Sequence, residues 1–211
     1  MKLLLAGLDR LTDAELGEPS ALPGWTRRHL LAHIASNAEA LGRLVSWAHT
    51  GVENRMYASP EQRAVDIEMG ARRPDLRAWV RDSAEMLTRA LGDLPAQAWD
   101  AKVVTAQGRT VPAREIPWMR QRETHIHAVD LRAGTTFADL PPEFLMALLD
   151  DVTRWRTARP GPALTIVTPE TTHELPGEGP PARVELPLAT AAAWLTGRHT
   201  DPTLPTLPGW L

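Results

Sequence analysis

Two histidines and a glutamate in this sequence have the residue types and the spacing of a divalent-metal site. Glu123 and His127 lie four residues apart, so on a helix their side chains would lie one turn apart on the same face. A carboxylate and imidazoles that leave further positions open suit catalytic Zn²⁺ or another first-row divalent ion. Such an ion needs a third protein ligand. His33 would supply it, because it lies beside Ile34 on the flank of an apolar helical face.

Two other arrangements of the histidines fit the same sequence. A strand in this region would place Glu123, His125 and His127 on one face and would make His33 unnecessary. His29 lies four residues before His33 and could form a rival pair, but two arginines beside it favour an exposed first helical turn. The residues around Glu123 favour a helix, so we expect His125 to point away. A Glu–His pair at this spacing also occurs on exposed helices that bind no ion.

Amphipathic helices are predicted around these candidates and would position them. Thr26 is placed as the N-cap of a long helix that contains His33. Pro60 suits the first turn of a shorter helix, which Gly70 is expected to end. Pro117 must either start or kink the helix of the Glu–His pair. Together the patterns predict helices over residues 1–12, 27–50, 60–70, 74–92, 113–133, 139–158 and 189–196.

A Pro-Gly-Pro segment at 160–162 predicts the boundary between two domains. Residues 1–159 would form a helical bundle with the metal site, and residues 160–211 a small α+β domain. Short strands are predicted in this second domain at 164–167, 173–175 and 183–186, and a hairpin-like pair around Val103 in the first.

The composition narrows the class of protein and the chemistry. The 211 residues carry a formal charge of −3 with no basic block, which argues against nucleic acid as a partner. No apolar run reaches the length of a membrane span or forms a signal core, so we expect a cytoplasmic protein. Cysteine is absent, which excludes disulfides, thiolate ligands and a cysteine nucleophile, so any thiol chemistry needs an external thiol. Arginine greatly outnumbers lysine, as in high-GC bacterial genomes.

Four segments, in this order, resemble one known family. They are Leu22-Pro23-Gly24-Trp25-Thr26 leading into His33, Val111-Pro112-Ala113-Arg114-Glu115, Arg122-Glu123 through Asp130-Leu131, and Trp194-Leu195-Thr196-Gly197-Arg198. With these segments the chain resembles mycothiol-dependent maleylpyruvate isomerases, within the wider DinB-like, YfiT-like group of metalloproteins. The resemblance spans nearly the whole chain.

The resemblance implies a fold and a set of site residues. The fold would be mainly α, with an N-terminal DinB-like four-helix bundle and a small C-terminal α/β lobe that is sterol-carrier-protein-like. The metal ligands of the family fall on His33, Glu123 and His127. Its functional C-terminal arginine falls on Arg198, which would serve catalysis and mycothiol binding. Arg198 also suits a helix C-terminus, where its charge would interact with the helix dipole. The first helix is shorter than is usual for the family, which predicts a longer natural N-terminus.

The resemblance also implies a reaction. A metal-bound mycothiol thiolate would add to the cis double bond of maleylpyruvate, the resulting single bond would rotate, and elimination of the thiol would leave the trans isomer. A mycothiol S-transferase that acts on a small electrophile would use the same parts, and so would a non-catalytic metal or thiol-binding module. The partners would be small molecules, with no nucleic acid and no membrane. The sequence leaves open the native ion, the physiological substrate and the oligomeric state.

Three further residues lie near the predicted site elements in the sequence. Trp25 and Trp118 could line a pocket, or they could pack in the core. Asp130 follows His127 by three residues and could orient its ring as a hydrogen-bond acceptor, or could serve as a polar residue at a helix end.

Overall fold

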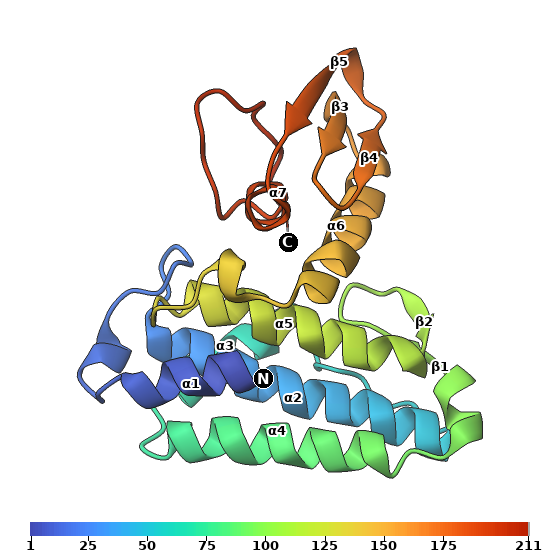
Figure 1. Cartoon of the computed structure of the whole chain (residues 1–211). Helices are drawn as coiled ribbons and strands as arrows, with labels where there is room; N and C mark the ends of the chain where they lie inside the picture. Colours follow the sequence, from blue (N-terminus) through green and yellow to red (C-terminus); the bar gives the residue numbers. More distant parts are fainter. Residues whose placement is uncertain (211) are drawn as a thin grey trace. The chain divides into compact units, whose positions relative to one another are not determined.

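The protein, described by a computed structural model over residues 1–210, is mainly helical and divides into two compact units (Figure 1). The first unit spans Met1–Thr135, and the second begins at Thr136. None of the helices within residues 1–210 has both the length and the apolar composition needed to cross a bilayer.

Five α-helices and a short hairpin form the first unit. The helices are α1 (Lys2–Arg10), α2 (Arg27–Thr50), α3 (Pro60–Ala71), α4 (Leu76–Gly92) and α5 (Ile116–Asp130). The hairpin pairs β1 (Lys102–Val104) with β2 (Thr110–Pro112), and 3-10 turns cover Glu15–Gly17, Ala96–Asp100 and Ala113–Glu115. The long helix α2 packs against α3, α4 and α5, so it forms the centre of the unit. A helical bundle in which α2 carries His33 and α5 carries Glu123 and His127 is therefore the framework of the candidate site.

The caps of α2 and α3 follow the chemistry expected from the sequence. Thr26 caps α2 and accepts from the backbone N–H of His29, and Gly51 ends the helix with a φ of +74°. Ser59 caps α3 by accepting from the backbone N–H of Gln62, and Pro60 occupies the first turn.

Gly70 is the penultimate residue of α3, so the helix ends one residue beyond the predicted stop. A Cβ atom at this position would lie 2.6 Å from Cζ3 of Trp79 and 3.1 Å from Cβ of Ala32. Trp79 is itself fixed by a hydrogen bond of 2.6 Å from its Nε1 to Oε1 of Glu39. The missing side chain of Gly70 thus allows α3 to approach α2 and α4 closely.

The second unit combines two helices with a three-stranded sheet. Its elements are a 3-10 turn (Phe137–Asp139), α6 (Pro142–Thr157), β3 (Pro162–Val167), β4 (Thr172–Leu175), β5 (Glu178–Glu185) and α7 (Leu188–Leu195). The strand order is β4-β3-β5, with β4 antiparallel and β5 parallel to β3. A small C-terminal sheet with helices confirms the fold class that the sequence predicts.

The structure places α6 in the second unit, whereas the sequence placed it at the end of the bundle in a domain of residues 1–159. The buried side chain of Arg156 explains the difference. Its Nη2 and Nε donate to the carbonyl of Leu195 at 2.6 and 3.2 Å, and its Nη1 donates to the carbonyl of Pro208 at 3.0 Å. These bonds tie α6 to α7 and to the chain that follows. The prolines at 160–162 end the helix, but the compact units divide at 135/136.

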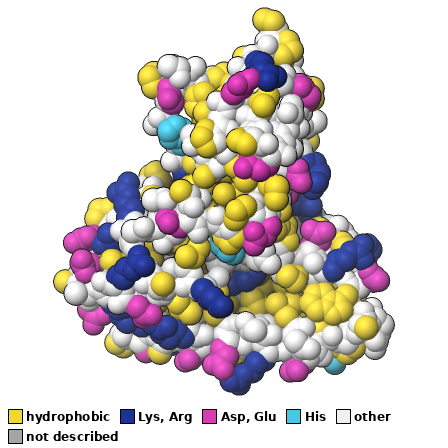
Figure 2. Space-filling model, in the orientation of Figure 1, with side chains coloured by type: hydrophobic (Ala, Val, Ile, Leu, Met, Phe, Trp, Pro, Cys, Tyr) yellow, Lys and Arg dark blue, Asp and Glu magenta, His cyan; other side chains and the backbone are white. Residues whose placement is uncertain are grey.

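Charged side chains of both signs are interspersed over the face drawn in Figure 2. Several charged side chains of the first unit pair, for example Arg77 with Asp13 at 2.9 Å and Arg73 with Asp75 at 2.8 Å. Exposed pairs of this kind contribute little to stability, so the packing of the helices carries most of it.

The two helical glycines Gly42 and Gly70 are a matched pair for testing the packing of α3. No atom lies within 4 Å of a Cβ built at Gly42, so we expect Gly42→Ala to raise the free energy of unfolding by up to about 1 kcal/mol. Gly70→Ala should lower it by about 1–3 kcal/mol, because Trp79 must move. Urea denaturation measures both values, and equal effects of the two substitutions would contradict the close approach of α3.

Candidate metal centre

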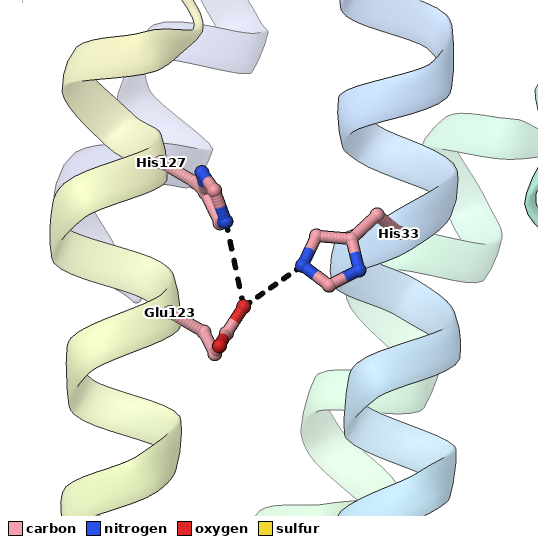
Figure 3. Close-up of side chains that lie close together, drawn as sticks. All are labelled: His33, Glu123 and His127. Carbon is pink, nitrogen blue, oxygen red and sulfur yellow. Dashed lines mark hydrogen bonds and ion pairs between the residues drawn. The ribbon is translucent and has the colours of Figure 1, made fainter. Parts of the chain in front are cut away.

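Helices α2 and α5 bring His33, Glu123 and His127 together, as Figure 3 shows. Nε2 of His33 lies 2.8 Å from Oε2 of Glu123, and Nε2 of His127 lies 3.4 Å from the same oxygen. The two imidazole rings are nearly perpendicular, at 87°, with centroids 5.1 Å apart. One donor atom from each residue lies within 4.8 Å of the other two, so the three side chains can converge on one ion.

Arginines tie α2 to α5 on both sides of the cluster. At the start of α2, Arg27 donates from Nε to the carbonyl of Leu131 at 2.9 Å and from Nη2 to that of Arg132 at 3.1 Å. Further along α5, Nη1 of Arg120 donates to the carbonyl of Ile34 and to Oδ1 of Asn37, both at 2.9 Å. The separation of the two helices is thereby held by hydrogen bonds on either side of the candidate ligands.

Buried charges explain the ionisation of the cluster. Burial alone would raise the pKa of Glu123, but hydrogen bonds from His127 and His33 hold it well below the ordinary value. Burial lowers the pKa of His33 and outweighs the opposing effect of Glu123. Burial also acts to lower the pKa of His127, yet the hydrogen bonds and charges of Asp130 and Glu123 raise it to about 9. Glu123 is therefore an ionised carboxylate flanked by two imidazoles.

Asp130 fixes the ring of His127. Its Oδ2 lies 2.9 Å from Nδ1 of His127, and the residue is only 1% exposed. Histidines that bind metal ions commonly donate their other ring N–H to a carboxylate in this way. Of the two roles that the sequence left open for Asp130, the structure thus shows the contact with the histidine.

The donor set fits a divalent first-row ion. Each histidine directs its Nε2 at the same carboxylate oxygen, so a cation there would take the place of the protons that now lie between the rings and Glu123. A carboxylate with two imidazoles is a ligand set of catalytic zinc and of other divalent ions. As metal ligands the three residues remain a prediction.

The structure rules out both alternative arrangements of the histidines. The segment around Glu123 is helical, and Nδ1 of His125 lies 2.8 Å from the carbonyl of Gln121, one turn back along α5. His29 serves the cap of α2, where its Nδ1 accepts from the backbone N–H of Thr26 at 3.3 Å, and its Nε2 pairs with Glu68 at 3.2 Å. Neither histidine belongs to the ligand group found among residues 1–210.

The remaining predicted residues have separate surroundings. The ring of Trp25 lies 5.7 Å from that of His33, so this tryptophan borders the cluster. Trp118 is half-buried in the first turn of α5. Arg198 lies in the second unit, where its Nη1 donates to the carbonyl of Thr196 at 2.7 Å and its Cζ lies 5.9 Å from the ring centre of Trp210. Thr196 is the C-cap of α7, so this contact fits the structural role considered for Arg198.

Sequence reasoning did not find Arg63, Tyr57 and Arg120, which also lie at or near the cluster. Nη2 of Arg63 lies 3.2 Å from Nδ1 of His33, and its Cζ lies 5.5 Å from the ring centre of Tyr57. Burial lowers the pKa of Arg120 to about 10. No spacing links Arg63 to His33, since they belong to different helices joined by the loop over 51–59.

Comparisons with known proteins agree with this architecture. Residues 2–132 match the family described as the mycothiol maleylpyruvate isomerase N-terminal domain. The crystal structure of a mycothiol-dependent maleylpyruvate isomerase is 39% identical in sequence and superposes with a TM-score of 0.91, covering 99% of this chain and 92% of that one. A histidine-to-alanine mutant of that isomerase gives the same identity, coverage and TM-score. No match was found among curated proteins.

Metal content tests the ligand set directly. In protein purified without added metal, we expect close to one divalent ion per chain in the wild type and in His125→Ala, and little in His127→Ala. Elemental mass spectrometry gives the content. His125→Ala is the matched control, because it removes a histidine from the same helix without touching the cluster. Equal loss of metal in both variants would contradict the ligand set.

The raised pKa of His127 predicts how the stability of the chelated, metal-free protein depends on pH. Because the folded-state pKa is about 9 and the ordinary value is 6.5, the stabilisation from protonated His127 is fully present below pH 6.5 and is lost as the pH rises through about 9. We expect the free energy of unfolding to fall across this window in the wild type but not in His127→Gln. Denaturant titrations at each pH measure it, and the same decline in both proteins would argue against the charged pair.

Proposed function

We propose a function for this chain from its family, since it belongs to the mycothiol maleylpyruvate isomerase family. In this proposal the protein is a metal-dependent enzyme that uses mycothiol to convert maleylpyruvate to its trans isomer. The observation that carries the metal dependence is the convergence of His33, Glu123 and His127 inside the domain that matches the family. The identity of the ion as Zn²⁺ is part of the proposal and rests on the nitrogen and oxygen donors.

An external thiol is consistent with the composition of the chain, which contains no cysteine. The bound ion and mycothiol would supply a thiolate that adds reversibly to the conjugated cis double bond, so that the bond rotates before the thiol leaves. Mycothiol-dependent chemistry of this kind needs a reduced thiol, which supports a bacterial cytoplasmic setting. The arginine-rich composition is in keeping with such a source.

The residues of the cluster have distinct roles in this proposal. Glu123 acts as a ligand and not as a general base, because hydrogen bonds from His33 and His127 keep its carboxylate ionised and engage its oxygen Oε2. Asp130 holds His127 with Nε2 directed at Glu123, so His127 is positioned before any ion arrives. The ring of Trp25 lies 5.7 Å from that of His33 and borders the candidate ligands.

Arg198 is proposed as a catalytic residue that also binds mycothiol, on the strength of its position in the Trp-Leu-Thr-Gly-Arg segment. A guanidinium can hold a carboxylate with two parallel hydrogen bonds or stabilise an enolate.

The test measures isomerisation and thiol together. With zinc-loaded protein, mycothiol and maleylpyruvate, we expect the trans product to form while the total thiol concentration stays constant. His127→Ala should lose about a hundredfold or more of the activity, because the ion is not retained, and His125→Ala should keep it.

The balance of thiol and product separates this proposal from its rivals. Thiol consumed in proportion to product would identify a mycothiol S-transferase. Tight binding of zinc and thiol without turnover of any cis substrate would indicate a binding module, and either result would overturn the isomerase proposal.

A further inference from the structure

Arg63 places a positive charge against the candidate metal centre without an acidic partner of its own. It projects from α3, is half-buried, and directs Nη2 at Nδ1 of His33. Several other arginines of the bundle pair with carboxylates, such as Arg27 with Glu18 at 2.6 Å, and Arg43 and Arg120 donate to carbonyl oxygens. Among residues 1–210, no acidic side chain forms a salt bridge with Arg63. Its guanidinium is therefore available to a carboxylate that comes from outside the chain.

The present contact of Arg63 allows only one arrangement of the proton on His33. An arginine can only donate, so Nδ1 of His33 must accept, and the proton of the neutral ring lies on Nε2, where it is donated to Glu123 at 2.8 Å. A divalent ion would take the lone pair of Nε2. The neutral ring would then carry its proton on Nδ1, which leaves Arg63 facing a donor instead of an acceptor.

His127 shows the contrast. Its Nδ1 faces the carboxylate of Asp130, which accepts a proton whether or not an ion occupies Nε2. Of the contacts at the two Nδ1 atoms, only that between His33 and Arg63 is incompatible with a bound ion, so Arg63 must leave Nδ1 when the ion binds.

We propose that Arg63 is an anion-binding residue of the site: when a divalent ion binds to His33, the guanidinium turns from His33 to a carboxylate of a small dicarboxylic substrate. This inference rests on the proposed function, and it names the residue that would select the substrate within the bundle. A guanidinium matches a carboxylate with two parallel hydrogen bonds, which a lysine ammonium cannot reproduce.

Tyr57, the single tyrosine of the chain, supports this role. Its ring lies beneath the guanidiniums of both Arg63 and Arg43, whose Cζ atoms are 5.5 and 6.0 Å from the ring centre. The aromatic face stabilises the cation when it no longer contacts His33. Burial raises the pKa of Tyr57, so its hydroxyl remains a donor that can share the same anion.

The experiment compares Arg63→Met, Arg63→Lys and, as a matched control, Arg72→Met. Arg72 follows the same helix but is 76% exposed and pairs with Glu68. Zinc affinity is measured by competition with a chromophoric chelator, and the dissociation constant of maleate is measured by calorimetry on zinc-loaded protein without thiol. Circular dichroism confirms that each variant is folded.

We expect zinc to bind Arg63→Met as tightly as the wild type or more tightly. The substitution removes a positive charge beside the ion and an N–H donor that would face the protonated Nδ1 of His33. Maleate should bind Arg63→Met about tenfold or more weakly, since a charge-assisted contact is lost. Arg63→Lys should recover part of this affinity, and Arg72→Met should match the wild type in both measurements. With maleylpyruvate, the loss should appear mainly in KM and much less in kcat.

A lower zinc affinity in Arg63→Met would show that Arg63 supports His33, and an unchanged maleate affinity would show that it does not bind the anion; either result overturns the proposal. Neither measurement requires turnover. If maleate binding depends on Arg63 while the wild type fails to isomerise maleylpyruvate, only the proposed reaction is wrong.

Discussion

The carboxylate of Glu123 lies between two imidazoles in a buried position, and the arrangement of α2 and α5 depends on that charge being satisfied. An ionised carboxylate removed from water is costly unless it is paired and hydrogen-bonded. Here the partners come from both helices, so the two helices cannot move apart without breaking the contact of 2.8 Å to His33, which leaves Glu123 with the longer contact to His127 on its own helix. The apolar core alone imposes no such restriction, because hydrophobic contacts have no direction.

The surroundings of the cluster turn this pairing into a defined geometry. Arg27 and Arg120 bind backbone carbonyls of the opposite helix on either side of it, and Asp130 fixes the ring of His127. His33 is fixed less firmly, since its second nitrogen meets only the side chain of Arg63. His127 is thus already oriented for an ion, whereas His33 would have to exchange its contact with Arg63. In the proposal for Arg63, this asymmetry connects binding of the ion to recognition of an anion.

The sequence predicted those parts of the fold and the site that depend on local patterns. The cap at Thr26 and the four-residue spacing of Glu123 and His127 act within one helix, so they were correctly interpreted as helical. The choice of His33 over His29 also followed from a local feature, because the first turn of a helix uses its polar side chains for capping. The order of the motifs predicted the isomerase family, and the comparisons confirmed that family.

The sequence could not predict features that depend on which surfaces meet. Gly70 marks the end of α3 to within one residue, but nothing in the sequence shows that the ring of Trp79 also requires a glycine at this position. The periodicity of α6 shows that one face is buried without showing against what, and its partners prove to be α7 and β4. Arg63 reaches His33 only because the loop before α3 returns the chain to α2. Contacts of this kind carry no signal in the spacing of residues.

The division of the chain at 135/136 leaves all three candidate ligands, Asp130 and Arg63 within the first unit. The candidate ion site and the side chains that contact its histidines therefore lie in one compact unit, together with the family match over residues 2–132. A substitution in the C-terminal sheet replaces none of the candidate donor atoms, whereas a substitution in α2 or α5 can remove a ligand outright. Under the proposed function, we therefore expect the sequence to tolerate more change in that sheet than on the facing surfaces of these two helices.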